Sequence, residues 1–262
     1  MKWITTSSTA PLAVAMALLI AVAALLGGCE SKDESKLTVA LTGKYPPFST
    51  YDKEGNLVGV DVDVARAIAS HMGREAKFVP TAWASILPGL KSGRYDVIIG
   101  SMAVTPERAK QVNFSDPYYL SGAQLFVHEK HADKVNSIED AEGMVLGVTT
   151  GETYEHYLRR DHPDVEVRAL GGAAEIFTQV EQGSLNGFVI DRIVGGQQIR
   201  KLDKPFVMVG PILYPEKMAI PVRKDRPELL KKVNAALKDM KKSGQLQEIL
   251  DKWLGEGVAK AG

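Results

Sequence analysis

Arg108 is the first residue whose type and position suggest binding chemistry, and it lies in IIGSMAVTPERAKQVNFSDPYY (98–119). Thr105 followed by Pro106 predicts a helix start, because a Thr hydroxyl caps a helix and proline loses nothing at the first helical position. Arg108 then falls in the first turn, where a capping box has Glu or Gln and where the helix dipole disfavours a cation. A bound anion would reverse that penalty. We therefore interpret Arg108 as a candidate carboxylate-binding group, the alternative being an ordinary surface or ion-paired arginine.

Further side chains with complementary chemistry stand near predicted strand ends. Asp191 offers a negative charge that suits an ammonium group, or it caps the helix that follows. Tyr45 and Trp83 supply flat apolar walls, or are a turn residue and a core residue. Backbone N–H groups near Ala103 and at a helix start around Thr153 add donors for an anion. A carboxylate clamp, an ammonium acceptor and two aromatic walls together describe a site for a free α-amino acid.

The elements that must position these groups alternate between strands and helices from Leu37 onward. Such alternation predicts βαβ units, an α/β fold and mostly parallel sheets whose carboxyl ends hold the ligand. The extended stretch at 118–130 separates two strand–helix series, which indicates two lobes. The predicted strands cover 37–41, 76–80, 95–100, 144–149, 165–170 and 187–190, and the predicted helices cover 59–73, 83–93, 105–112, 152–160 and 172–183, with two further helices at the end of the chain. Asp61 or Asp63 is expected to cap the helix at 59–73.

Composition narrows the possible functions. The 262 residues include 32 basic and 32 acidic side chains, and 45% are hydrophobic. This balance argues against a nucleic-acid-binding surface and allows a large core. The sequence has no glycine-rich phosphate loop, zinc spacing or GxSxG elbow. His128 and His131 form an HxxH pair without a third ligand nearby, so we expect no metal and no cofactor.

The first 28 residues are typical of a signal peptide, with Lys2 ahead of an apolar run over 10–26. The run ends in Leu26-Gly27-Gly28-Cys29, which resembles a bacterial lipobox and implies that Cys29 is lipidated, with palmitate among its acyl groups. Cys29 is the only cysteine, which excludes a disulfide. A plain signal peptide or a short anchor helix is the alternative. Residues 29–36 then form a charged, lipidated tether.

Three segments of the chain resemble bacterial extracellular solute-binding proteins that serve polar amino-acid ABC transporters. These segments are YPPFSTYDKEGNLVGVDVDVARAIA, ILPGLKSGRYDVIIGSMAVTPER and VNFSDPYY, and the resemblance extends from about Leu37 to Leu254. It implies the two-lobed periplasmic-binding-protein fold of type II, with hinge crossings near Tyr119 and Met218. Residues 37–119 and 218–262 would form the first lobe, and residues 120–217 the second.

The resemblance also implies roles for individual residues. Arg108 would hold the ligand α-carboxylate and Asp191 the α-ammonium, while Tyr45 and Trp83 would enclose the ligand side chain. Main-chain groups of Ser101, Ala103 and Thr153 would complete the site. The implied protein is a monomeric lipoprotein of the periplasm or cell surface, anchored to the membrane, which closes on an amino acid and docks on a permease.

Three departures from the family pattern bear on the ligand. Many relatives have an acidic residue where Thr42 stands, so its absence disfavours a cationic ligand. Ala103 lacks the hydroxyl that relatives often use to support the ligand's charged groups. Glu152 replaces a common small residue, and its charge would oppose a second ligand carboxylate. We therefore expect a neutral or polar amino acid.

An enzyme on the same fold is the alternative from another functional class. Cyclohexadienyl dehydratases are similar in segments that read ALTGKYPPFS and PTAW here, and Glu216 would be their general acid. We favour the interpretation that Glu216 is a surface residue of the hinge loop. A lipid anchor and an ammonium partner at Asp191 suit a receptor better than a dehydratase. We therefore expect a binding protein without catalytic activity, with a ligand-sensing receptor subunit as a third possibility.

Overall fold

The computed structural model describes residues 1 and 33–262, with the exception of the side chains of residues 201 and 202. Residues 35–262 cluster into one unit. The predicted signal peptide (apart from Met1) and the lipidation residue Cys29 lie outside the described residues. Within the described part of the chain, no helix is long and apolar enough to cross a membrane.

The first of two large sheets contains five strands. Their order is β4 (Glu75–Pro80), β1 (Lys36–Leu41), β5 (Val97–Ile98), β13 (Pro221–Val222) and β7 (Asn113–Phe114). The helices that pack with this sheet are α2 (Val60–His71), α3 (Trp83–Lys91), α8 (Pro227–Ser243) and α9 (Gln245–Leu254). A small hairpin of β2 (Thr50–Tyr51) and β3 (Leu57–Val58) precedes α2. We call this sheet and its helices the first lobe.

The second sheet contains six strands, and three longer helices accompany it. The strand order is β10 (Glu166–Leu170), β9 (Val145–Thr149), β11 (Gly187–Asp191), β8 (Tyr119–His128), β12 (Phe206–Ala219) and β6 (Met102–Ala103). The helices are α5 (Thr153–Asp161), α6 (Ala173–Glu181) and α7 (Arg192–Leu202). Short helical segments are α4 (Pro106–Ala109), η1 (Glu129–His131) and η2 (Glu139–Ala141). We call this sheet without β6, together with α5, α6 and α7, the second lobe, and we count β6 and α4 with the first lobe.

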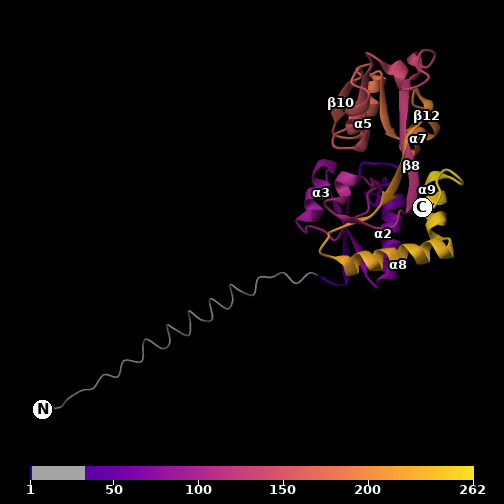
Figure 1. The fold of residues 1–262 in the computed structure, drawn as a ribbon. Coiled ribbons are helices and arrows are strands. Elements are labelled where there is room, and N and C mark those ends of the chain that lie inside the picture. Colours follow the sequence, from indigo (N-terminus) through magenta and orange to yellow (C-terminus); the bar gives the residue numbers. More distant parts are fainter. Residues whose placement is uncertain (2–32) are drawn as a thin grey trace. The chain divides into compact units, whose positions relative to one another are not determined.

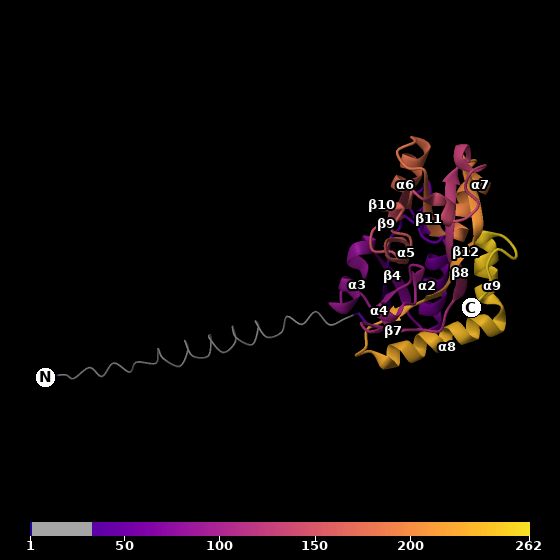
Figure 2. The same cartoon turned by 45° about the horizontal axis from the view of Figure 1, so that its top comes forward.

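Two long strands connect the lobes. β8 and β12 lie side by side as an antiparallel pair in both views (Figure 1 and Figure 2). Tyr119 pairs with Met218 at the end nearest the first lobe, where Met218 also pairs with Ala103 of β6. The predicted crossings near Tyr119 and Met218 thus lie on these two strands. The division into lobes at 119/120 and 217/218 stays a prediction.

Both sheets are mixed, so the prediction of mostly parallel sheets was wrong. The parallel core is limited to β4-β1-β5 and β10-β9-β11. β8 runs antiparallel to β11, and β13 runs antiparallel to β5, because the chain enters each sheet from the other lobe. The predicted strand at 95–100 shortens to β5, and the predicted helix at 105–112 shortens to the four residues of α4.

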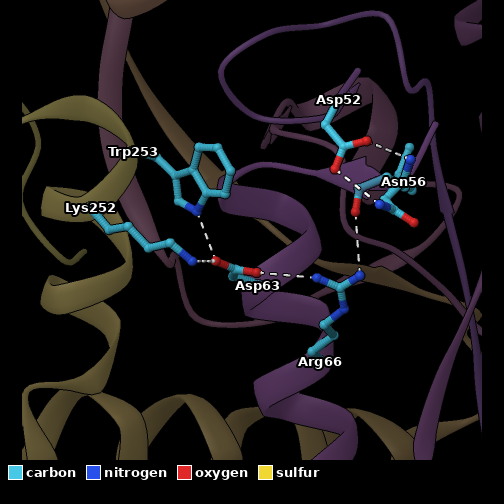
Figure 3. A network of polar contacts seen from close by, with 7 residues as sticks. Asp52, Asn56, Asp63, Arg66, Lys252 and Trp253 are labelled. Atoms are coloured by element: carbon cyan, nitrogen blue, oxygen red, sulfur yellow. Dashed lines mark hydrogen bonds and ion pairs between the residues drawn. The ribbon is translucent and has the colours of Figure 1, made fainter. Parts of the chain in front are cut away.

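The acidic residues at the start of α2 do not cap it, contrary to our expectation. The cap position is Gly59, and no side chain caps the helix. Asp63 instead joins α2 to α9: its Oδ2 accepts bonds from Trp253 Nε1 at 2.8 Å and from Lys252 Nζ at 2.7 Å (Figure 3). Arg66 approaches the other carboxylate oxygen at 3.4 Å. The C-terminal helix is thereby fixed against the first lobe.

The C-terminal helices follow their apolar periodicity. α8 buries Leu229, Val233, Ala236, Leu237 and Met240, and α9 buries Leu246, Leu250 and Leu254. A fully buried leucine side chain contributes about 1.5–3 kcal/mol relative to an exposed one. Gly244 separates the helices at φ 84°, a left-handed conformation that glycine adopts without strain. The two helices predicted at the end of the chain are present.

Candidate ligand-binding site

A cavity of about 310 Å³ lies between the lobes. Residues of both lobes line it: Thr42, Lys44, Tyr45, Pro80, Thr81, Ala82, Trp83, Gly100, Thr149, Glu152, Gly171, Gly172 and Ala173. The structure brings the two predicted aromatic walls to this one cavity. Tyr45 follows β1 and stacks on Phe48 with ring centroids 5.8 Å apart, and Trp83 begins α3.

Arg108 extends from the first lobe to the second. Its Nη1 donates to the Ala103 carbonyl at 3.0 Å, and its Nη2 donates to the Gly151 carbonyl at 3.4 Å. Nη2 also lies 3.7 Å from Glu152 Oε2, and the guanidinium carbon lies 5.4 Å from the centre of the Trp83 ring. The surface-arginine alternative does not hold, because the Arg108 side chain is only 11% exposed.

The predicted cap at the start of α4 is present, but the dipole argument for Arg108 fails. Thr105 Oγ1 accepts a bond from the Arg108 backbone N–H at 3.2 Å, as the sequence predicted. A helix of four residues has almost no macrodipole, and Arg108 lies in its last turn as well as in its first. Arg108 therefore stays a candidate binding residue because its guanidinium contacts both lobes.

Arg108 also lines a second hollow between the lobes, of about 760 Å³, together with residues of α4 and α5. It does not line the cavity that holds the aromatic walls. Gly151 and Glu152 of the second lobe stand at its guanidinium instead. Arg108, the predicted carboxylate-binding residue, thus contacts the second lobe outside the 310 Å³ cavity.

Asp191 has the capping role that was the alternative to ammonium binding. It ends β11 and caps α7, with Oδ1 accepting the N–H groups of Ile193 at 2.8 Å and Val194 at 3.3 Å. Its Oδ2 is buried without a hydrogen-bond partner. Burial raises the pKa of this carboxyl to about 6. The nearby Ser121 side chain partly opposes this rise of the Asp191 pKa, and the α7 cap uses only Oδ1.

Other unpaired polar atoms belong to the strands that connect the lobes. Tyr119 OH and Ser121 Oγ on β8, and Tyr214 OH on β12, are buried and have no partner among the described residues. Asp191 raises the pKa of Tyr119 further, after the larger effect of burial, so the two groups are electrostatic neighbours. Buried polar atoms without partners are rare and call for an explanation. Of these three residues and Asp191, only Tyr214 lines either of the two hollows between the lobes.

Glu216 is buried, so our interpretation of it as a surface residue was wrong. It lies on β12 and is 5% exposed. Its carboxylate accepts bonds from Thr153 Oγ1 at 2.6 Å and from Tyr154 OH at 3.1 Å, both at the start of α5. Burial raises the pKa of Glu216 to about 7. The Thr153 side chain thus has a role that sequence analysis did not predict.

A buried network that the sequence did not reveal fixes Ser101. This residue has φ 55°, which is unusual for a non-glycine residue. Its N–H donates to Tyr118 OH at 2.9 Å and its hydroxyl donates to Asp61 at 3.0 Å, while Tyr118 OH donates to Asp61 at 2.6 Å. Burial raises the pKa of Asp61 to about 6. The Ser101 N–H is therefore engaged, which leaves its carbonyl as the free main-chain group.

The HxxH pair does not form a metal site. His128 Nδ1 accepts the Lys130 N–H at 3.3 Å, and His131 Nε2 lies 3.2 Å from Asn186 Nδ2. Across the described residues, no group of three His, Cys, Asp or Glu side chains is placed to hold a metal ion.

Comparison with known proteins gives consistent matches along the folded chain. A family model described as "Bacterial extracellular solute-binding proteins, family 3" matches residues 37–256. The L-cystine-binding protein TcyJ of Escherichia coli (strain K12) is 33% identical over 229 residues, which are 87% of this chain and 86% of the relative. ABC transporter arginine-binding protein 1 of the same organism is 31% identical over 222 residues, covering 83% of this chain and 90% of the relative.

Solved structures confirm the predicted fold. An ancestral arginine-binding protein bound to glutamine matches with a TM-score of 0.81 and 36% identity, over 86% of this chain and 100% of the other. The ancestral amino acid-binding protein AncCDT-1, described as a precursor of cyclohexadienyl dehydratase, matches with a TM-score of 0.80 and 36% identity, over 84% of this chain and 96% of the other.

These relatives are binding proteins rather than enzymes, which confirms the corresponding prediction. The sequence itself has no glycine-rich phosphate loop, zinc spacing or GxSxG elbow. The family model spans nearly all of the described chain, and the relatives cover it over most of their own length. The chain belongs to the bacterial extracellular solute-binding proteins, family 3.

Proposed function

We propose that this protein is the amino-acid-binding component of an ABC transporter and holds one free α-amino acid between its lobes. One observation carries the proposal. The first lobe presents the Arg108 guanidinium, the second lobe presents a buried Asp191 oxygen without a partner, and Glu152 interacts electrostatically with both. A molecule with one carboxylate and one ammonium satisfies both groups, so closure buries no unpaired ion.

In this proposal each predicted residue has a defined task. Arg108 binds the α-carboxylate through two parallel charge-assisted hydrogen bonds, which are about twice as strong as neutral ones. The first N–H groups of α5, which begins at Thr153, add donors that the helix itself leaves unused. Asp191 Oδ2 accepts the α-ammonium. Tyr45 and Trp83 bound the space for the ligand side chain.

The charges around that space favour a neutral or polar side chain. The ionisable side chains that line the cavity with Tyr45 are one base, Lys44, and one acid, Glu152. Glu216 already accepts two hydrogen bonds, so it does not require a cation from the ligand. Thr42 and Thr81 supply uncharged polar surface. A ligand side chain with net charge would leave one of these groups uncompensated.

L-Cystine is a specific candidate within this class. Its second half is itself a zwitterion, and Lys44 and Glu152 present one cation and one carboxyl to the same cavity. A relative that is 33% identical is an L-cystine-binding protein. Cystine therefore belongs in any ligand screen beside the neutral proteinogenic amino acids.

The transport role extends the proposal beyond the binding site. Closure of the lobes around the ligand, along β8 and β12, would create the form that a permease recognises. The family description places its members outside the cytoplasm. We also propose the lipid anchor at Cys29, which rests on the LGGC motif alone.

A thermal-shift screen tests the proposal. The panel contains the twenty proteinogenic L-amino acids, L-cystine and two keto acids, with prephenate as the probe for the dehydratase alternative. A ligand at 100 times its Kd stabilises the protein by about 2.7 kcal/mol, so a binder raises the melting temperature by several degrees. We expect neutral amino acids or cystine to give the largest shifts. If no α-amino acid shifts the transition, or if prephenate is converted to an aromatic product, the proposed function is refuted.

A further inference from the structure

Glu152 stands where a ligand carboxylate is expected. It occupies the cap position of α5, but its side chain makes no capping hydrogen bond. The carboxylate points instead to the first lobe, with Oε2 3.7 Å from Arg108 Nη2. The Glu152 side chain is 14% exposed and also lines the 310 Å³ cavity. An internal carboxyl group thus lies at the cation that the proposed ligand needs.

The groups around Glu152 are mostly acidic. Arg108 stabilises its ionised form, whereas burial and the carboxylates of Glu216 and Asp191 oppose ionisation, and together they raise the pKa of Glu152 to about 8. The other titratable groups that face it from neighbouring elements are Tyr45, Tyr154, Tyr214 and, across the same cavity, Lys44. The ratio of neutral to ionised Glu152 therefore depends on whether Arg108 is paired with it.

A ligand carboxylate changes that balance. Two carboxylates that share one site do not both stay ionised, because like charges a few ångströms apart disfavour the second ionisation. Arg108 already donates from Nη1 to the Ala103 carbonyl and from Nη2 to the Gly151 carbonyl, so few of its N–H groups remain for carboxylates. When a ligand carboxylate takes those remaining groups, Glu152 loses its compensating cation and gains a negative neighbour.

We propose that Glu152 competes with the ligand α-carboxylate for Arg108, so that the ligand binds the protein with Glu152 protonated and binding takes up a proton. This inference rests on the proposed function, because it requires the ligand carboxylate at Arg108. It makes Glu152 a residue that couples the affinity for the ligand to pH.

The direction of the pH effect follows from the proton uptake. Below pH 7 the free protein already holds the proton on Glu152, and the competition is absent. Above the pKa of about 8, the proton must be gained on binding, and affinity falls by about tenfold per pH unit. The ligand's own amino group also titrates in this range. A ratio of wild-type to variant affinity removes that contribution, because the ligand is the same in both measurements.

The decisive variant is Glu152→Gln, which keeps the size of the side chain and removes the charge. Every amino acid of the panel and L-cystine are screened by thermal shift at pH 6.5 and pH 9, and the binders are titrated by calorimetry in two buffers of different ionisation enthalpy. We expect similar Kd values for both proteins at pH 6.5. At pH 9 the variant binds about tenfold more tightly, and the wild type takes up about one proton more than the variant.

Controls separate competition from other effects. Glu228→Gln removes a carboxylate from exposed α8, where the side chain is 76% exposed, and should leave the pH profile of the wild type unchanged. Glu152→Ser, with a residue favoured at cap positions, replaces Glu152→Gln if the latter does not fold. A wild-type to variant Kd ratio that is the same at both pH values overturns the competition and leaves the proposed function intact. Absence of binding by every probe, in wild type and variant alike, overturns both.

Discussion

Replacing Arg108 with alanine is the most direct test of the ligand-binding site. The guanidinium contributes hydrogen bonds to the Ala103 and Gly151 carbonyls at 3.0 and 3.4 Å, and its side chain is 11% exposed. In the proposed complex it also carries both bonds to the ligand carboxylate. Among the hydrogen bonds of the described residues, Arg108 has the only guanidinium that contacts both lobes. The truncation removes this group and leaves the carboxylate of the bound ligand buried without a cation.

The expected magnitude follows from that geometry. Removing one partner of a buried, hydrogen-bonded charge pair costs about 2–5 kcal/mol. This corresponds to an increase in Kd of about 30- to 4,000-fold. Arg108→Lys should fall between wild type and Arg108→Ala, because lysine retains the charge and loses the two-pronged geometry that matches a carboxylate.

Calorimetric titration with the best binder of the amino-acid panel measures the effect. Arg168→Ala is the matched control, since Arg168 is 41% exposed on β10 and pairs with the exposed Glu166. Its Kd should stay within about twofold of wild type, as expected for a surface ion pair. Melting temperatures of all variants exclude unfolding as the cause. A wild-type Kd for Arg108→Ala would show that the carboxylate binds elsewhere, and our reasoning about the site would be refuted.

Three further predictions use other residues. Asp191→Asn retains the Oδ1 acceptor that caps α7 and loses the charge at Oδ2. We therefore expect calorimetry to show a loss of affinity for α-amino acids of about 30-fold or more. Normal binding by this variant would require another partner for the ligand ammonium. Burial raises the pKa of Asp61 to about 6, so the folded protein holds a proton on this carboxyl more tightly than the unfolded chain does. The resulting contribution to stability is complete below about pH 4 and is lost as the pH rises through 6. Asp61→Asn should therefore flatten the pH dependence of the melting temperature between pH 4 and 6, and an unchanged slope would contradict this. Cys29→Ser should release the protein from the membrane fraction of cells, whereas retention would favour a transmembrane anchor.

The helices and the parallel strands could be predicted from local pattern. The apolar residues of α2 and α8 recur at helical spacing, and Pro227 and Gly244 mark the ends of α8 as the sequence rules state. Short buried runs such as 144–149 and 187–190 reappear as β9 and β11 with nearly the same bounds. Local periodicity is sufficient where an element buries one continuous face.

β12 could not be predicted in this way. Its sequence, FVMVGPILYPEKMA, contains Gly210, Pro211 and Pro215, which ordinarily interrupt a strand. The structure accommodates them with a register shift between Val209 and Tyr214 opposite β8. β12 is stabilised by its long pairing with β8. A local sequence pattern does not predict this pairing.

The sequence predicted that Tyr45 and Trp83 lie together, and they share a cavity, but Arg108 and Asp191 do not line it. The roles of these four residues toward a ligand stay predictions. The burial of Glu216 and the bond between Asp61 and Ser101 depend on residues 40 or more positions apart in the chain. Because no spacing rule connects such pairs, only the tertiary structure reveals them.

The contacts between the lobes indicate how ligand binding and closure are coupled. Arg108 contacts the second lobe through one hydrogen bond of 3.4 Å and one ion pair of 3.7 Å, both longer than the 2.7–2.9 Å of strong charge-assisted bonds. Contacts of this length contribute little to holding the lobes together. A ligand carboxylate at Arg108, with its ammonium at Asp191, would replace them by shorter bonds to both lobes at once. A ligand shifts a conformational equilibrium only by its difference in affinity for the two states. In the proposed complex, molecules that carry both charges would therefore favour the closed form, and an uncharged analogue of the same size would bind more weakly and favour it less.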